Sequence, residues 1–146
     1  MSANRHGALF EEELTHSVIG VFYDIHRTFG FGFREHIYVL AMERDLVAKG
    51  HRVDREVAAM IYHRGEPLAV QTLDMVVDEK LILEVKATER LHPSAESQLF
   101  GYLCATEWEV GLLLHFGREA KFYRAICENR FKRYRPQSAS STTSSP

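Results

Sequence analysis

Apolar residues recur at helical spacing in three parts of the chain. The first such stretch ends before Gly30 and is carried by Leu14, Val18, Val21, Phe22, Ile25 and Phe29. A second helix is predicted from about Arg34 to Lys49, with Gly50 after its end. A third is predicted from Pro93 to about Thr106, because proline suits the first turn of a helix.

Short runs rich in Val, Ile and Leu predict five strands. One begins at Val53 and is followed by turn residues 63–67 and by a second strand that reaches Val77. The others are predicted at Leu81–Lys86, Val110–Phe116 and Lys121–Ile126. The order αα-βββ-α-ββ predicts an α/β fold with a central mixed sheet flanked by helices.

Three charged side chains interrupt the two most apolar strands. If polar residues 78–80 form the loop of a hairpin, counting back along both strands places Asp74 directly opposite Glu84. Side chains alternate along a strand, so Lys86 shares the face of Glu84. A change of register by one residue would send Asp74 to the other face. The pattern therefore predicts two carboxylates and an ammonium in one place.

Such a set suits a hard divalent cation, Mg²⁺ or Mn²⁺, bound by Asp74, Glu84 and the Val85 backbone carbonyl. Lys86 would orient or deprotonate the attacking water, or stabilise charge on a phosphate. The alternative is an exposed hairpin with solvated charges. The apolar residues on both faces of these strands argue against it, because buried carboxylates are costly unless paired or bound to metal.

Two further motifs accompany this core. Residues 32–38 match GxxExxY and residues 98–102 match QxxxY, while Asp74 with Glu84-Val85-Lys86 matches D...(D/E)xK. From about Glu11 to about Cys127 the chain resembles the GxxExxY family of the PD-(D/E)xK nuclease superfamily. The resemblance implies a restriction-endonuclease-like fold and metal-dependent hydrolysis of phosphodiester bonds.

The added motifs supply candidate site residues on helix faces. Glu35 and Tyr38 lie three positions apart, and Gln98 and Tyr102 four positions apart, so each pair shares one face of its helix. Glu35 would complete the acidic cluster, either as a ligand of a second metal or by holding a metal-bound water. The amide and phenols would contact the phosphate or hold the ligating groups. Taken singly, Glu35 also suits a helix N-terminus, and the tyrosines also suit core packing.

Composition permits this interpretation without requiring it. The 146 residues, 45% of them hydrophobic, suffice for one domain, predicted at residues 8–135, followed by a disordered Ser/Thr-rich tail at 136–146. A formal charge of −2 excludes a general attraction to nucleic acid, so binding needs a local basic patch. One candidate patch lies at Arg130, Lys132, Arg133 and Arg135, although a solvated C-terminal extension is the favoured interpretation.

Cysteine usage and hydropathy bear on the compartment. Cys104 and Cys127 form no CxxC motif, which excludes the iron–sulfur cluster of some Cas4-like nucleases, and we expect reduced thiols. No stretch is apolar enough for a membrane span and no secretory signal is present, so a cytoplasmic protein is expected.

The leading hypothesis is a Mg²⁺- or Mn²⁺-dependent nuclease that acts on DNA in preference to RNA. The rival hypothesis is a non-catalytic nuclease-fold module that binds nucleic acid or a protein partner. A third is a homodimer in which the partner chain completes the substrate groove. The sequence leaves endo- or exonucleolytic cleavage undetermined.

Overall fold

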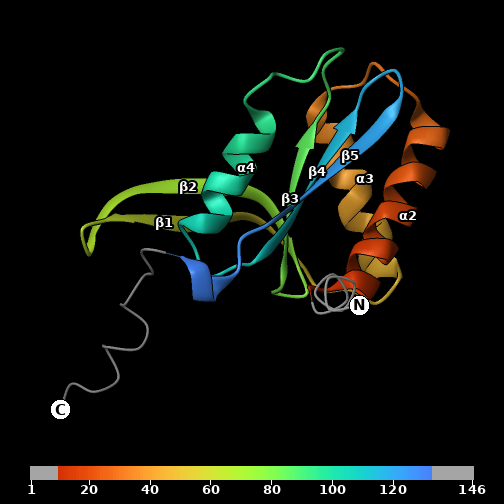
Figure 1. Cartoon of the computed structure of the whole chain (residues 1–146). Helices are drawn as coiled ribbons and strands as arrows, with labels where there is room; N and C mark the ends of the chain where they lie inside the picture. Colours follow the sequence, from red (N-terminus) through yellow and green to blue (C-terminus); the bar gives the residue numbers. More distant parts are fainter. Residues whose placement is uncertain (1–9, 133–146) are drawn as a thin grey trace, which may run out of the picture.

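The computed structural model describes residues 10–132 as helices and strands in the predicted order αα-βββ-α-ββ (Figure 1). The helices are α2 (Glu12–Phe29), α3 (Glu35–Ala48) and α4 (Ala95–Cys104). The strands are β1 (Val53–His63), β2 (Glu66–Val77), β3 (Leu81–Lys86), β4 (Val110–Phe116) and β5 (Ala120–Ile126), and a short 3₁₀ helix, η1, spans Asn129–Phe131. The α/β fold class is confirmed.

The five strands form one mixed sheet in the order β1-β2-β3-β4-β5. Only β3 and β4 run parallel, because α4 crosses between them, and the other neighbours are antiparallel. Val77 pairs with Leu81 across a loop of residues 78–80, so the register on which the predicted site depends is confirmed. Asp78 and Glu79 adopt positive φ angles in this loop.

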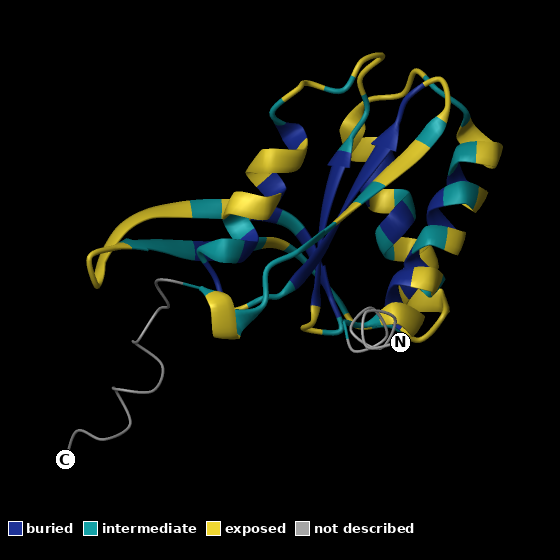
Figure 2. Cartoon of the chain, viewed as in Figure 1, coloured by how far each residue is buried: buried dark blue, intermediate teal, exposed yellow. Residues whose placement is uncertain are grey.

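The sheet separates two apolar layers. Helices α2 and α3 cover one face, where Phe22, Tyr38 and Phe116 are fully buried, and α4 covers the other with Leu99 and Leu103. Strands β3 and β4 are therefore buried on both faces, as Figure 2 shows. This explains why they are apolar throughout instead of alternating, and why a charged residue in β3 is exceptional.

The β1–β2 hairpin extends beyond the rest of the sheet and curves past α4 (Figure 1). At the tip of the hairpin, Arg64 and Gly65 form the turn that joins the two strands. Both residues have positive φ, as a tight hairpin turn requires. A register shift between Ile61 and Tyr62 marks a bulge near the tip. The outer part of the hairpin is exposed, in contrast to the sheet centre (Figure 2).

Helix α4 is shorter than predicted at both ends, and it finishes at Cys104 instead of near Thr106. Helix α4 begins at Ala95, because residues 93 and 94 form a turn in which the Ser94 N–H bonds His92 Nδ1.

The predicted basic patch is described only in part. In it, Lys132 donates hydrogen bonds to the carbonyls of Thr106 and Trp108. Arg133, Arg135 and the tail at 136–146 lie outside the described residues, as do the ends of the predicted domain at 8–135. None of the described helices is long and apolar enough to cross a membrane.

The expectation of reduced cysteines is wrong for this structure, in which Cys104 and Cys127 form a disulfide. Their Cα atoms are 5.5 Å apart, because the end of α4 packs beside the end of β5. A sequence separation of 23 residues gave no sign of this proximity.

We expect reduction of this disulfide to lower the free energy of unfolding by about 3 kcal/mol, because the cross-link restricts the unfolded chain. Urea unfolding with and without reductant measures the change. The double variant Cys104→Ala/Cys127→Ala is the control, since its stability should not respond to reductant. If reductant also left the stability of the parent protein unchanged, the result would contradict the presence of the disulfide.

Candidate active site

The candidate active site lies where β2 and β3 separate. Counted away from the hairpin loop, the last backbone pair joins Met75 and Leu83. Asp74 and Glu84 occupy the next position on each strand. From there each carboxylate bonds the backbone of the opposite strand. The Asp74 N–H donates to Glu84 Oε2 at 3.2 Å, and the Val85 N–H donates to Asp74 Oδ2 at 2.8 Å. Side chains thus replace the carbonyl acceptors of the ladder and hold both acids in fixed positions.

The Val85 carbonyl belongs to the same opening. In a strand, the N–H and C=O of one residue point to the same side. Because the Val85 N–H points to Asp74, its carbonyl also faces β2, beyond the end of the backbone pairing. The three oxygen donors predicted from the sequence therefore face one gap.

Burial makes this acidic pair costly when both groups are charged. Glu84 is 9% exposed, and burial raises its pKa to about 7, with a further increase from the charge of Asp74. Burial also raises the pKa of Asp74, against the opposing hydrogen bond from Val85 and the charge of Lys86. Two carboxylates with raised pKa values at one place favour a bound cation.

Glu35 and Lys86 belong to the same electrostatic cluster. Glu35 is the first residue of α3, and although the residue is exposed, partial burial of its carboxyl raises its pKa. The charge of Asp74 adds to this increase, whereas Lys86 opposes it. Lys86 ends β3, and its charge also lowers the pKa values of Asp74 and Glu84. A helix on one face and two strands thus bring together the four predicted charged residues.

These residues fit a magnesium-type ion. Mg²⁺ keeps several waters and needs one or two protein carboxylates beside substrate oxygens. Asp74 and Glu84 each use one oxygen in a hydrogen bond to the opposite strand and retain a second for a ligand. Across residues 10–132, no three Asp, Glu, His or Cys side chains converge closely enough to form an all-protein metal cage. The arrangement therefore suits an ion that is bound partly by water and substrate.

The other predicted site residues are placed differently. Tyr38 is fully buried, stacks on Phe116 at 4.2 Å and donates a hydrogen bond to the Gly30 carbonyl at 2.6 Å. This hydrogen bond fixes the loop that leads into α3, and so it positions Glu35, the first residue of that helix. Gln98 is exposed on α4, and Tyr102 is half-buried in the α4 layer. Within residues 10–132, no hydrogen bond connects either side chain to the acids or Lys86.

Glu56 is an acidic neighbour that the sequence analysis missed. It lies in β1 with φ of 53°, whereas the other non-glycine residues with positive φ occupy turns or a helix cap. Arg55 pairs with Met75 and Val57 with Leu73, so Glu56 falls opposite Asp74, and its charge raises the pKa of Asp74. The signal in the sequence was an acid in an apolar strand, but the register that aligns it depends on the hairpin bulge.

His115 is a buried histidine of β4 that lies beside the end of β3. Its residue is 6% exposed, and Nε2 donates to the Thr88 carbonyl at 2.6 Å. This bond fixes the loop that leaves β3 after Lys86. His115 therefore supports the site as a structural neighbour and is not needed as a metal ligand.

The fold is that of a nuclease-type α/β domain. A family model described as the PD-(D/E)XK nuclease superfamily matches residues 12–126, and the chain belongs to that superfamily. Membership of the narrower GxxExxY group stays a prediction. No curated protein matches the sequence. Among solved structures, one described as "Crystal structure of SSO0001" is similar, with 18% identity and a TM-score of 0.46. The match covers 84% of this chain and 62% of that one.

Proposed function

We propose that this protein is a metal-dependent nuclease that hydrolyses phosphodiester bonds, with DNA as the preferred substrate over RNA. The observation that supports it is the reciprocal bonding of Asp74 and Glu84 across the β2–β3 gap, with the charge of Lys86 beside them. A scaffold role alone gives no reason to keep two raised-pKa carboxylates in a buried strand pair.

Each residue of the cluster has its own part in this reaction. Asp74, Glu84 and the Val85 carbonyl would hold Mg²⁺ or Mn²⁺, which supplies a polarised phosphate and an activated water when bound. Glu35 would hold a water at the edge of the cluster. Lys86 carries a cationic group to the place where charge develops on the phosphate. Water adds to phosphorus, the P–O bond to the leaving nucleotide breaks, and the leaving oxygen takes a proton.

Gln98 and Tyr102 are assigned to substrate contact instead of ligand support. Both lie on α4, which packs on the sheet face that carries Ile82. Glu84 lies two residues after Ile82 in β3, so its side chain is on that same face. Since neither side chain bonds the acidic cluster within residues 10–132, they are available to a phosphate group. Tyr38 is assigned a positioning role through its bond to Gly30.

The test is cleavage of labelled single- and double-stranded DNA and RNA with Mn²⁺ or Mg²⁺, comparing the parent with Lys86→Ala and Lys86→Arg prepared identically. We expect cleavage that EDTA stops and Lys86→Ala lacks. Partial activity in Lys86→Arg would support charge stabilisation, because arginine keeps the charge and does not act as a base.

Equal cleavage by parent and Lys86→Ala would refute the assignment. If neither protein cleaves, Mn²⁺ titration of the folded parent decides between the two classes of function. If the parent binds Mn²⁺ and Asp74→Asn does not, the metal-site assignment stands. If the parent does not bind Mn²⁺, the result favours a non-catalytic module that binds nucleic acid or a protein partner.

A further inference from the structure

The loop that joins α2 to α3 carries a group of phenylalanines next to the candidate active site. Phe29 is the last residue of α2, and Phe31 and Phe33 follow it in the loop. Glu35 of the acidic cluster then begins α3. Phe29 is 39% exposed and Phe33 is 46% exposed. Large apolar rings that gather in contact with water beside a site indicate a binding surface.

The two exposed rings are held in place by the core beneath them. Phe29 and Phe33 contact each other edge to face, with their ring centroids 5.5 Å apart. Both rings also meet the buried ring of Tyr38 edge to face, at 6.5 and 6.3 Å. The Phe33 N–H donates a hydrogen bond to the Tyr38 hydroxyl at 3.3 Å. The rings are therefore preorganised, and a flat ligand that stacks on them would order little more of the protein.

Two arginines flank these rings. Arg34 is exposed and separates Phe33 from Glu35 in the chain. Arg118, in the loop between β4 and β5, lies over the Phe31 ring with its guanidinium carbon 5.3 Å from the ring centroid. Aromatic rings interleaved with cations are typical of nucleic-acid-binding surfaces, because the rings stack on bases and the cations pair with phosphates. Since the whole chain carries a slight negative charge, such a local patch is what binding requires.

The loop of Arg118 is fixed beside the α2–α3 loop. His26 Nε2 and the Gly117 carbonyl lie 2.8 Å apart in a hydrogen bond that joins α2 to this loop. Figure 1 shows both loops and the end of β3 at the same end of the molecule. Arg118 also pairs with Glu89 at 3.0 Å, but both side chains are well exposed. Because an exposed ion pair contributes little stability, a phosphate can replace this carboxylate.

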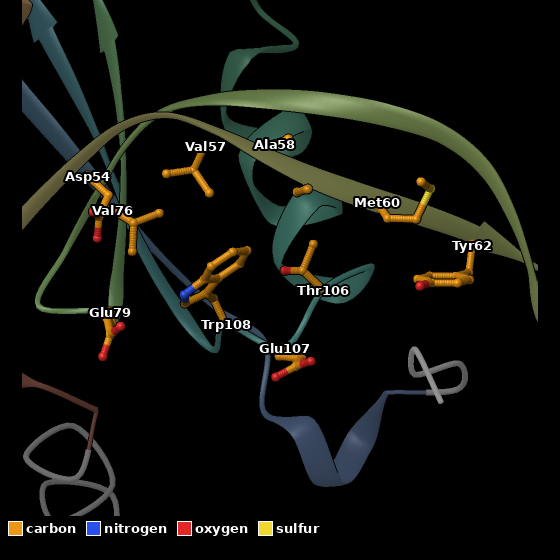
Figure 3. A pocket seen from close by; sticks show the side chains of 11 residues that line it. Asp54, Val57, Ala58, Met60, Tyr62, Val76, Glu79, Thr106, Glu107 and Trp108 are labelled. Carbon is orange, nitrogen blue, oxygen red and sulfur yellow. The ribbon is translucent and has the colours of Figure 1, made fainter. Parts of the chain in front are cut away.

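The groove beside β1 offers the opposite chemistry (Figure 3). It has a volume of about 690 Å³ and also contains an aromatic ring, that of Trp108, but three carboxylates line it: Asp54, Glu79 and Glu107. Asp54 and Glu79 share the guanidinium of Arg52, at 3.0 and 2.9 Å. This groove is therefore acidic and repels a phosphate backbone. We expect nucleic acid to reach the candidate active site over the α2–α3 loop instead.

We propose that Phe29 and Phe33 stack on unpaired bases next to the phosphate that is cleaved, while Arg34 and Arg118 contact neighbouring phosphates. Bases inside a duplex are already stacked and do not offer their faces to a side chain. The substrate is therefore single-stranded DNA or the single-stranded part of a longer molecule. Stacking tolerates any base sequence, because every base has a π-face. This inference rests on the proposed nuclease function and names its substrate class.

Binding measured without cleavage tests this assignment. The whole chain in EDTA is titrated into an end-labelled single-stranded DNA of about 12 nucleotides, and into the same DNA as a duplex, and fluorescence anisotropy is recorded. We expect the parent to bind the single strand at least about tenfold more tightly than the duplex, and Phe33→Ala to lose about tenfold for the single strand only. Phe33→Trp should keep the parental affinity, since indole also stacks. Arg118→Ala should weaken both complexes alike, because phosphate contacts occur in both.

Phe131→Ala is the matched control, because Phe131 is a ring exposed to 67% with the guanidinium of Arg130 over it, on η1. It should bind as the parent does. Unchanged duplex binding by Phe33→Ala shows that this variant is folded. If Phe131→Ala weakens single-strand binding and Phe33→Ala does not, the contact surface is assigned to the wrong residues.

Equal affinity of the parent for single strand and duplex would overturn the substrate class. If the parent binds neither, the proposal fails and the exposed rings are left to a protein partner. The nuclease function fails separately. Single-strand binding that Phe33→Ala weakens, in a protein that cleaves nothing, would keep this surface and refute the nuclease. Cleavage of single strands by Phe33→Ala with the parental kcat/KM would keep the nuclease and refute this surface.

Discussion

Replacing Asp74 with asparagine is expected to reduce metal-dependent cleavage at least about a hundredfold while the fold is retained. Asparagine keeps an oxygen that accepts the Val85 N–H bond, but it loses the charge that holds the cation. Single-turnover cleavage with Mn²⁺ and Mn²⁺ binding by electron paramagnetic resonance should both decrease. Loss of binding together with loss of cleavage would identify the carboxylate as a ligand.

Asp45→Asn is the matched control, because Asp45 is an exposed acid on α3 away from the cluster. Asp74→Ala goes further, since it leaves the Val85 N–H without its acceptor, and should also cost about 1–3 kcal/mol of stability. Cleavage by Asp74→Asn at the parental rate would show that the metal site is assigned to the wrong residues.

The second large effect concerns stability against pH in metal-free protein. Burial raises the pKa of Glu84 from 4.5 to about 7, so the folded state holds this proton more tightly than the unfolded chain. The free energy of unfolding therefore falls as pH rises from about 4.5 to about 7 and stays low above it. At 1.36 kcal/mol per pKa unit, the loss is about 3 kcal/mol. Asp74 and Glu35 change stability in the same direction.

Urea unfolding at pH 5 and pH 8 in EDTA measures this difference, with Glu84→Gln as the comparison. Glutamine keeps an acceptor for the Asp74 N–H and cannot ionise, so the variant should be the more stable protein at pH 8. Mn²⁺ at pH 8 should reverse the order, because only the parent binds it and a ligand present at about 1,000 times its Kd adds about 4.1 kcal/mol. A parent whose stability rises between pH 5 and 8 without metal would contradict this account.

Local sequence determined the elements and the central pairing. Alternation and apolar runs are properties of a few adjacent residues, so all five strands and three helices were predictable, with α4 about two residues shorter than predicted at each end. A three-residue loop fixes a hairpin register, so the residues on either side of it suffice to place Asp74 opposite Glu84. The acid-x-lysine spacing likewise put Glu84 and Lys86 on one face.

Contacts between distant segments required the tertiary structure. The disulfide depends on how α4 packs beside β5, and Glu56 aligns with Asp74 only through the long β1–β2 register and its bulge. The sequence pattern placed Tyr38 on the same helix face as Glu35. In the structure, however, the Tyr38 ring packs against Phe116 and lies in the core. Burial is likewise a property of the whole fold, and so the raised pKa of Glu84 follows from the layers on both sides of β3.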